Sequence, residues 1–293
     1  MLFKIPPMKT LLAKPVVDGM KKNLSSRIAN FHQHSGRVPK LAVVLVGDHP
    51  ASVIYTTKKG HTAVELGMKH ETIKLAASAS PQEVHEKIKF LNQDPSVDGI
   101  LIQRPLPSGF SEEEVLYWVS PEKDVDAFHP ENTGRLVLGL PCFKPCTPAG
   151  VMKLLDHYGI NPSGKIACVI GRSSIVGKPM AALLLQANAT VIQCHSKTPH
   201  LPSVTSQAEL LIVAAGKAGL VDASYVREGA IVVDVGIHRT TEGKICGDVV
   251  FDSVAKKASA LTPVPGSVGP MTIIMLMENT VWAAERREAA RAR

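Results

Sequence analysis

Tyr55 and Lys59 are residues whose types and spacing could support catalysis. They are four positions apart in a segment, 51–66, that predicts a helix, so both side chains should lie on one face. A lysine can transfer protons if desolvation lowers its pKa, and an aromatic ring can stack on a planar heterocycle. A solvated lysine face and a core tyrosine are the alternatives that spacing alone leaves open.

Two further segments could bring polar side chains to such a lysine. The predicted strand 98–103 ends at Gln103, and ligands of parallel sheets gather at the carboxyl ends of strands. The loop 121–130 carries Asp124 and Asp126, and a carboxylate there could bind ring N–H groups. Both aspartates could instead be turn residues that bond to nearby backbone.

A glycine-rich turn, 171–177, lies between a predicted strand and a predicted helix. This context is typical of a dinucleotide site, where helix N-terminal amides bind pyrophosphate, although an ordinary tight turn is the alternative. The next strand ends without the carboxylate that usually binds a ribose 2′-hydroxyl. Arg172 and Ser196 could bind a 2′-phosphate there. A dinucleotide at this turn is therefore expected to be NADP rather than NAD.

Strand and helix patterns alternate along the whole chain, which predicts an α/β fold with parallel sheets. Buried strands are predicted at 41–47, 72–78, 98–103, 165–170, 189–194, 210–215 and 231–236. Ser80 with Glu83 predicts a capping box, and Ser111 before three glutamates predicts another helix start.

In the second half of the chain, the alternation of strands and helices begins after a predicted linker. The stretch 143–148 is expected to be this linker, and Thr147 is expected to cap a helix that ends at Gly159. Pro270 is expected to open a final helix.

The composition indicates a globular, cytoplasmic protein. The chain has 293 residues, of which 45% are hydrophobic and 20% charged, which excludes a disordered chain and suggests two domains. No apolar run approaches the ~18 residues of a membrane span, and the N-terminus lacks the layout of a signal peptide. The five scattered cysteines argue against a disulfide framework. Cys142 and Cys146 have no second ligand pair, so no metal is expected.

The formal net charge of +7 suits anionic small substrates or nucleic acid. The basic residues are dispersed, and aromatic residues make up only 4% of the chain. A basic face interleaved with aromatic rings is therefore hard to build, which argues against a nucleic-acid partner.

Taken together, these segments resemble the bifunctional methylenetetrahydrofolate dehydrogenase/methenyltetrahydrofolate cyclohydrolase family. The matching motifs occur in family order over nearly the whole chain: Y-x-x-x-K at 55–59, DGILIQRPLP at 98–107, PEKDVDAFHPENTGRL at 121–136, PCTPAG at 145–150, GRSSIVGKP at 171–179, CHSKT at 194–198, GDV at 247–249 and TPVPGSVGPMT at 262–272. Each motif is weak by itself, and the set is specific.

The resemblance implies a two-domain α/β fold with an active-site cleft between the domains. The N-terminal domain would span 1–147 and be completed by a C-terminal helix, 271–293, and a Rossmann-like NADP-binding domain would span 148–270. The resemblance also implies a homodimer formed through the Rossmann domain. Tetrahydrofolate derivatives would be the substrates: NADP would accept a hydride from 5,10-methylenetetrahydrofolate, and water would then convert the methenyl product to 10-formyltetrahydrofolate.

The resemblance also implies catalytic roles for four residues. Lys59 would assist proton transfer in the hydrolytic step, and Gln103 would orient it. Tyr55 would stack against the folate, and Asp126 would anchor the pterin. We expect Lys59 to have a lowered pKa, caused by burial and by nearby positive charge.

The resemblance also implies which residues contact the substrate and which contact the cofactor. The substrate would contact Tyr55, Lys59, Ile102, Gln103, Asp126, Pro265, Gly266 and Gly269. NADP would contact Gly171, Arg172, Ser173, Ser196 and Ile237. Arg172 and Ser196 would hold the 2′-phosphate.

The chain departs from the family pattern at three positions. Arg104 stands where leucine is usual, Ala127 replaces a glycine beside Asp126, and Ser267 replaces the second glycine of the usual P-G-G. If the glycine at 127 had a positive φ, alanine would strain the loop.

Two other functions stay open at this stage. Another NADP-dependent dehydrogenase on a similar two-domain fold would share the 171–177 turn, but it would not explain Tyr55, Lys59 and Gln103 together. A non-enzymatic basic protein would use the +7 charge on nucleic acid, with a steep salt dependence of binding.

Overall fold

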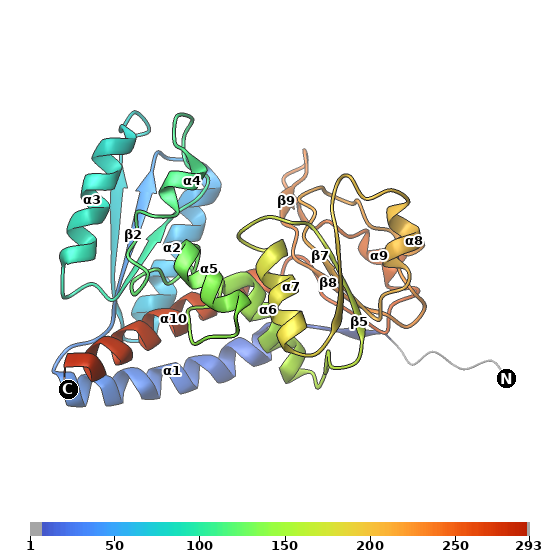
Figure 1. Ribbon diagram of the computed structural model, residues 1–293, viewed down its shortest axis with the longest axis horizontal. Coiled ribbons are helices and arrows are strands. Elements are labelled where there is room, and N and C mark those ends of the chain that lie inside the picture. Colours follow the sequence, from blue (N-terminus) through green and yellow to red (C-terminus); the bar gives the residue numbers. More distant parts are fainter. Residues whose placement is uncertain (1–7, 292–293) are drawn as a thin grey trace. The chain divides into compact units, whose positions relative to one another are not determined.

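The computed structural model describes residues 8–291 (Figure 1). The chain forms two compact units. The small-sheet unit consists of Asp18–Cys146 with the segment from Ile273 onward, and the large-sheet unit consists of the segment up to Val17 with Thr147–Thr272.

The small-sheet unit is built on three parallel strands in the order β3–β2–β4. Their bounds are Lys40–Val46 for β2, Lys69–Leu75 for β3 and Gly99–Ile102 for β4. The central strand β2 is an almost continuous hydrophobic run, as expected for a parallel strand covered on both faces. Helices α3 (Pro81–Gln93) and α2 (Pro50–Glu65) lie on its two sides (Figure 1).

Helix α3 packs against the central strand β2 and forms part of the hydrophobic core of the small-sheet unit. Its residues Val84, Ile88 and Leu91 are buried at helical spacing and pack with alternate residues of β2. The predicted capping box is confirmed, because Ser80 Oγ accepts from Glu83 N and the Glu83 carboxylate accepts from Ser80 N. Ser111 likewise caps the short helix α4 (Glu112–Val115).

Two long helices complete the small-sheet unit. Helices α1 (Lys14–Ser35) and α10 (Val268–Arg291) lie side by side (Figure 1), and Arg27 forms ion pairs of 2.6 Å with both Glu278 and Glu285. Helix α5 (Pro130–Val137) follows the aspartate-bearing loop.

The large-sheet unit contains six parallel strands in the order β1–β11–β8–β7–β5–β6. The strands are β1 (Lys9–Thr10), β5 (Ile166–Ile170), β6 (Thr190–Cys194), β7 (Leu210–Val213), β8 (Ile231–Asp234) and β11 (Ala260–Leu261). A separate antiparallel hairpin pairs β9 (His238–Arg239) with β10 (Ile245–Cys246). The helical segments are α6 (Cys146–His157), α7 (Gly177–Gln186), α8 (Leu201–Thr205), η1 (Ala223–Tyr225) and α9 (Phe251–Val254).

Every predicted strand is present, so the α/β class with parallel sheets is confirmed. Strand β3 begins earlier than predicted, at Lys69. The predicted linker 143–148 is wrong: Phe143 and Cys146 are buried, and α6 already begins at Cys146, so Thr147 lies inside the helix. The final helix begins at Val268, two residues before Pro270.

The N-terminal segment differs from the expected domain division. Lys9 and Thr10 pair in parallel with Ala260 and Leu261, which places residues 8–17 in the large-sheet unit rather than in the N-terminal domain. Residues 1–7, 292 and 293 of the expected domain ranges lie outside the described residues.

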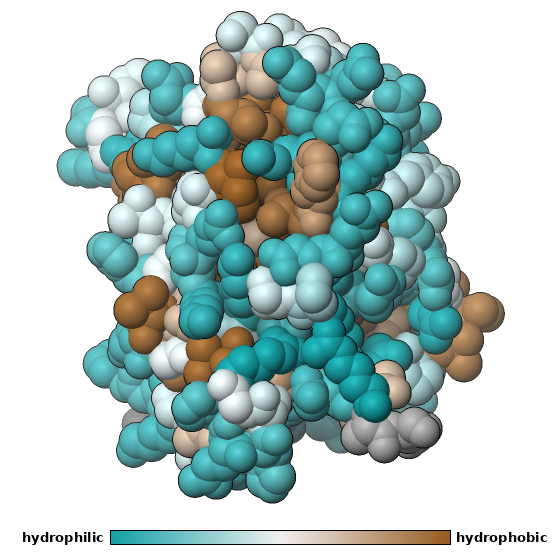
Figure 2. All heavy atoms as spheres, turned by 90° about the vertical axis from the view of Figure 1, so that its left-hand side faces the viewer, coloured by the Kyte–Doolittle hydropathy of each residue, from teal (hydrophilic) through white to brown (hydrophobic). Residues whose placement is uncertain are grey.

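Hydrophilic side chains cover most of the molecular face seen in Figure 2, with smaller hydrophobic areas between them. Over residues 8–291, none of the helices combines the length and the apolar character that crossing a bilayer requires.

Candidate functional site

Lys59 and Gln103 are joined by a direct hydrogen bond in the small-sheet unit. Lys59 Nζ donates to Gln103 Oε1 at 2.9 Å. Helix α2 carries Lys59, and Gln103 immediately follows β4, so the pair forms at the carboxyl end of a parallel strand, as predicted. Tyr55 lies one turn before Lys59 on α2 and is partly buried, which raises the pKa of its hydroxyl.

The side-chain amide of Gln103 is fixed in one orientation. Its Nε2 donates to the backbone carbonyl of Arg104 at 2.7 Å. This bond identifies the amide nitrogen, so the oxygen must face Lys59. Gln103 therefore presents an acceptor to the lysine and holds its amine in place.

Burial lowers the pKa of Lys59 below its ordinary value. The direction agrees with the sequence-based expectation, but part of the expected cause is wrong. The groups whose negative charge acts on Lys59 are Asp126 and, in its ionised form, Cys146, and both raise the pKa of Lys59 instead of lowering it. Desolvation therefore outweighs two opposing charges, and no nearby cation is needed.

Asp126 is the carboxylate that the structure brings to Lys59. Burial raises the pKa of the Asp126 carboxyl, while Lys59, the Cys146 thiol and Arg104 oppose this rise. Lys59 and Asp126 therefore form an electrostatically coupled pair in which burial disfavours charge on both partners.

Asp124 has a different role from Asp126. Its Oδ2 accepts from His129 N at 2.8 Å and from Asn132 Nδ2 at 2.9 Å, and burial raises the pKa of its carboxyl to about 6. The turn interpretation is thus correct for Asp124, which shapes the loop that carries Asp126.

Ala127 has a φ of 62°, in the left-handed region that favours glycine. Its side chain is buried. The strain anticipated at this departure from the family pattern is therefore present beside Asp126.

Arg104, the second departure, stays within the small-sheet unit. Its guanidinium pairs with Glu112 and lies 5.9 Å from the centre of the Phe128 ring. Arg104, Ile102, Asp126 and Phe128 line one small pocket. The arginine is therefore part of the wall around Asp126 and does not extend freely into solvent.

Two residues that support this loop, Cys146 and Asn279, were not predicted from the sequence to do so. Cys146 is fully buried, and its Sγ donates to Val125 O at 3.4 Å. Asn279 Nδ2 donates to the same carbonyl at 2.8 Å and to Lys144 O at 3.0 Å. A polar asparagine among the apolar residues of α10 was the available signal for a buried hydrogen-bonding role.

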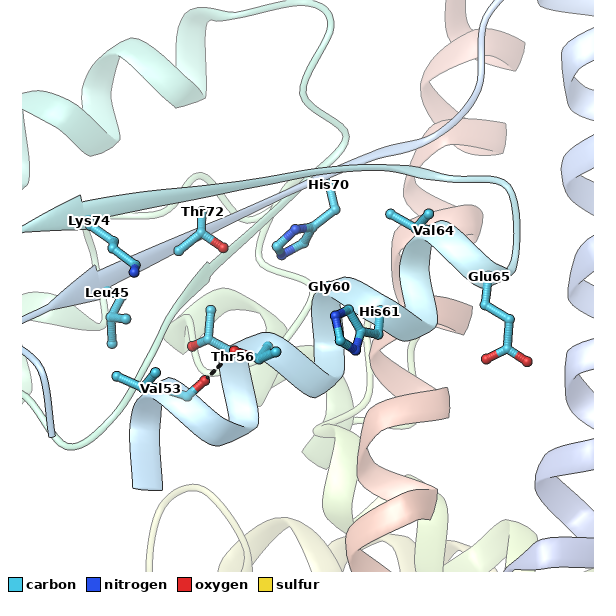
Figure 3. Close-up of a pocket in the computed structure, with 11 residues that line it drawn as sticks. Leu45, Val53, Thr56, Gly60, His61, Val64, Glu65, His70, Thr72 and Lys74 are labelled. Carbon is cyan, nitrogen blue, oxygen red and sulfur yellow. Dashed lines mark hydrogen bonds between the residues drawn. The ribbon is translucent and has the colours of Figure 1, made fainter. Parts of the chain in front are cut away.

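Helix α2 also borders a separate cavity of about 600 Å³ on another side (Figure 3). His61, His70 and Lys74 line it together with threonines and aliphatic side chains, and Lys59 and Tyr55 do not. The two sides of α2 are thus chemically distinct, and the Lys59–Gln103 pair does not belong to this cavity.

The large-sheet unit contains the predicted dinucleotide turn between β5 and α7. Gly171 has a φ of 123°, and a Cβ on it would lie 2.1 Å from Ala214 O. A Cβ on Gly177 would lie 2.2 Å from Gly171 O. Both positions therefore require glycine. Ser173 Oγ accepts from Val176 N and Gly177 N at 3.2 and 3.3 Å, which fixes the start of α7.

Arg172 and Ser196 follow the neighbouring parallel strands β5 and β6, and both are exposed. Ile237 lies between β8 and β9 and is 49% exposed. A glycine turn at a helix N-terminus, flanked by an exposed guanidinium and a hydroxyl, fits a phosphorylated dinucleotide. These residues could hold NADP.

The remaining predicted substrate residues lie in or beside the loop after β11. Pro265 and Gly266 are exposed, and Gly269 is in the first turn of α10. Ser267, the third departure, is buried, and its hydroxyl has no hydrogen-bond partner. These residues are in the large-sheet unit, whereas Lys59 is in the small-sheet unit, so their joint contact with one substrate stays a prediction.

Among residues 8–291, the structure shows no cluster of three or more His, Cys, Asp or Glu side chains that could hold a metal ion. Cys142 is partly buried and Cys146 is buried, and both are free thiols.

Comparison with known proteins identifies relatives over nearly the whole chain. Residues 11–126 match the model of the tetrahydrofolate dehydrogenase/cyclohydrolase catalytic domain, and residues 145–288 match that of the NAD(P)-binding domain. The bifunctional protein FolD of Streptococcus thermophilus is 50% identical over 273 residues, which cover 93% of this chain and 96% of the relative.

Solved structures give the same result. The bifunctional FolD methylenetetrahydrofolate dehydrogenase/cyclohydrolase of Campylobacter jejuni has a TM-score of 0.93 and 49% identity, covering 96% of this chain and 99% of that one. The Trypanosoma brucei enzyme, solved with NADP and an inhibitor, has a TM-score of 0.91 and 32% identity, covering 96% and 98% of the two chains.

Proposed function

The chain belongs to the tetrahydrofolate dehydrogenase/cyclohydrolase family, and from this premise we propose that it catalyses two successive reactions of folate one-carbon metabolism. The first is the NADP-dependent oxidation of 5,10-methylenetetrahydrofolate to 5,10-methenyltetrahydrofolate. The second is the hydrolysis of that product to 10-formyltetrahydrofolate. The observation that carries the proposal is the buried Lys59 amine, hydrogen-bonded to Gln103 and coupled to Asp126.

The oxidation needs two rings held in the correct relative orientation. NADP, when bound, supplies the hydride acceptor. The chain contributes binding: Arg172 and Ser196 would contact the 2′-phosphate, while Gly171, Ser173 and Ile237 would contact the rest of the cofactor. Tyr55 would stack on the folate. Fixing both partners removes most of the entropic part of the barrier.

The hydrolysis needs a group that can accept a proton from attacking water. A charged lysine would repel the methenyl cation, whereas burial favours the neutral amine of Lys59. One N–H of that amine is directed to Gln103 Oε1, which leaves its lone pair available for the proton. Lys59 is therefore the proposed general base, and Gln103 is the residue that orients it.

The other predicted substrate contacts belong to the same proposal. Asp126 would bind the N–H groups of the pterin. Ile102 lines the pocket that contains Asp126, and Pro265, Gly266 and Gly269 would border the folate from the other unit. The small-sheet unit would then be the folate domain and the large-sheet unit the NADP domain.

We also propose a homodimer formed through the large-sheet unit. Light scattering on the purified protein would check this, since a monomeric mass at micromolar concentration would contradict it. The cytoplasmic location expected from the sequence stays a prediction.

A paired assay tests the two activities in one tube. Purified protein would receive methylenetetrahydrofolate with NADP or with NAD, and reduced cofactor, methenyl product and formyl product would be quantified. We expect turnover with NADP and accumulation of the formyl product. Absence of turnover with both cofactors would contradict the proposal and favour a different NADP-dependent dehydrogenase.

Arg172→Ala tests the assignment of the cofactor. Loss of a guanidinium–phosphate contact should lower kcat/KM for NADP by about 10- to 100-fold and leave kcat/KM for NAD nearly unchanged. Lys178→Ala removes a nearby exposed cation from the same turn and serves as the control. Equal losses with both cofactors would assign Arg172 a structural role.

A further inference from the structure

The G-D-V segment at 247–249 has no role in the function proposed above, yet its aspartate is fully buried. Asp248 Oδ2 accepts from Ala215 N at 2.7 Å and from Gly216 N at 2.9 Å. These two amides follow β7 at its carboxyl end. Asp248 therefore fixes the backbone that leaves the sheet where ligands of parallel sheets bind.

The second oxygen of Asp248 binds a histidine from the β9–β10 hairpin. His238 Nε2 lies 2.7 Å from Asp248 Oδ1, and the His238 side chain is 24% exposed. One carboxylate thus connects the loop after β7 to strand β9.

Asp234 anchors this connection at the end of β8. Its Oδ1 accepts from Gly236 N and Asp248 N, and its Oδ2 accepts from Val249 N, at 2.9 to 3.0 Å. A Cβ on Gly247 would lie 1.9 Å from Asp234 Oδ2, so the carboxylate occupies the space that a side chain would need. The network is therefore tightly packed.

The residues held by this network border the proposed cofactor site. Ile237 lies directly between Gly236, which is bonded to Asp234, and His238, which is bonded to Asp248. On the other side, Ala214 precedes the two amides bound by Asp248, and its carbonyl packs against Gly171 of the dinucleotide turn. Both predicted contact points, Ile237 and Gly171, are thus adjacent to residues that the carboxylates fix.

We propose that His238 is a positioning residue for the cofactor: its hydrogen bond to Asp248 holds Ile237 in the conformation that contacts NADP. This inference rests on the proposed function, since it assumes a dinucleotide at the turn 171–177. A hydrogen bond to a buried carboxylate is strong enough to select one loop conformation over others. Without that bond, the backbone around Ile237 would keep the bond from Gly236 N to Asp234 and the pairing of His238 with Cys246, but it would lose its side-chain connection to Asp248.

Two substitutions at position 238 separate positioning from packing. His238→Phe keeps a ring of similar size and removes the hydrogen bond. His238→Gln places an amide nitrogen close to the position of Nε2 and restores a donor. Thr241→Ala, at an exposed position in the turn of the same hairpin, is the matched control.

The measurements are the NADP dissociation constant by isothermal titration calorimetry, the melting temperature without ligand, and kcat and KM. We expect His238→Phe to raise the dissociation constant and KM for NADP about tenfold, with kcat within about twofold of wild type. His238→Gln and Thr241→Ala should stay within about threefold of wild type in NADP affinity. His238→Gln and Thr241→Ala should melt close to the wild-type temperature, whereas His238→Phe should stay folded but melt a few degrees lower, because it leaves Asp248 Oδ1 without its partner.

Two results would overturn the inference. One is wild-type NADP affinity in His238→Phe, and the other is a loss in His238→Gln as large as that in His238→Phe. The wild-type titration distinguishes the two proposals. If the wild type binds no NADP, the proposed function fails. If it binds NADP and His238→Phe binds equally well, only the role of His238 fails.

Discussion

The two units differ in the groups that stabilise their buried carboxylates. Asp234 and Asp248 of the large-sheet unit receive hydrogen bonds mainly from backbone amides, whose positions the sheet fixes. Asp126 of the small-sheet unit is balanced by three side chains, Lys59, Cys146 and Arg104. Backbone dipoles cannot gain or lose a proton, whereas a lysine amine can. The first arrangement makes a scaffold, and the second can perform acid–base chemistry.

Removing the Lys59 amine should have the largest effect of these substitutions, and it should act on the hydrolytic rate. Lys59→Ala deletes the proposed base, so we expect the hydrolytic rate to fall by about 10²- to 10⁴-fold, with NADP affinity unchanged. Formation of the formyl product and calorimetric NADP binding are the two readouts. Lys58→Ala, at the exposed neighbouring lysine, is the control and should retain activity. Equal loss in both variants would mean that general positive charge, rather than the Lys59 amine, matters.

Substituting Asp234, a buried carboxylate of the large-sheet unit, should lower the stability of the fold. In Asp234→Asn, the amide must present an NH₂ group to a backbone N–H, because both oxygens of Asp234 are acceptors. We expect a loss of about 1–3 kcal/mol, measured as a lower urea midpoint at neutral pH. An unchanged midpoint would show that the network can rearrange, which would weaken the contrast between the units.

Asp124→Asn is the corresponding substitution of a buried aspartate in the small-sheet unit, and its effect on stability should depend on pH. The bonds from His129 N and Asn132 Nδ2 both end on Oδ2 of Asp124, so an asparagine oxygen can accept them in its place. The folded pKa of about 6 lies above the ordinary 3.8, so ionised Asp124 destabilises the fold as pH rises between these values. The stability of Asp124→Asn relative to wild type should therefore increase from pH 4 to pH 6 and then level off. A relative stability that decreases over this range would contradict the assigned direction.

Gln103→Glu should move the hydrolytic pH profile. A carboxylate in place of the amide oxygen would favour the charged form of Lys59 and raise its pKa. Because the neutral amine is the proposed base, the rising limb of the pH–rate profile should move up by about one unit or more. Gln82→Glu, on the exposed start of α3, is the charge-matched control. A profile that stays in place would separate Gln103 from proton transfer.

Ala127→Gly should have the smallest effect. Glycine adopts the positive φ without strain, but it gains entropy in the unfolded chain, so we expect a net stabilisation below about 1 kcal/mol. The same substitution at Ala182, inside α7, should destabilise by about 1 kcal/mol. Comparing the two urea midpoints isolates the contribution of φ. A destabilised Ala127→Gly would show that the methyl packing outweighs the strain.

The fold was predictable where hydrophobic periodicity is strong. The buried strands and the capped start of α3 follow directly from residue pattern. Helix α1 was not identified, although Val16, Met20, Leu24 and Ile28 recur at helical spacing and are all buried. The start of β3 was missed because Lys69, His70 and Glu71 lie on a sheet edge and carry no hydrophobic signal.

The site was predictable as residue types but not as contacts. Pattern and resemblance together named Lys59, Gln103 and Asp126, and the structure joins them. The supporting residues Cys146 and Asn279 depend on tertiary packing between distant segments, which spacing along the chain does not encode. The origin of the Lys59 pKa shift was unpredictable for the same reason, because desolvation depends on the surrounding three-dimensional packing.

The bond from Asn279 to the carbonyl of Val125 has a consequence for biosynthesis. A ribosome delivers Lys59, Gln103 and Asp126 long before it delivers Asn279, which is 154 residues after Val125. The loop that carries Asp126 therefore receives this support only after α10 has been translated. A nascent chain that stalls earlier contains the three site residues without this bond, so completion of the site is tied to late synthesis of α10.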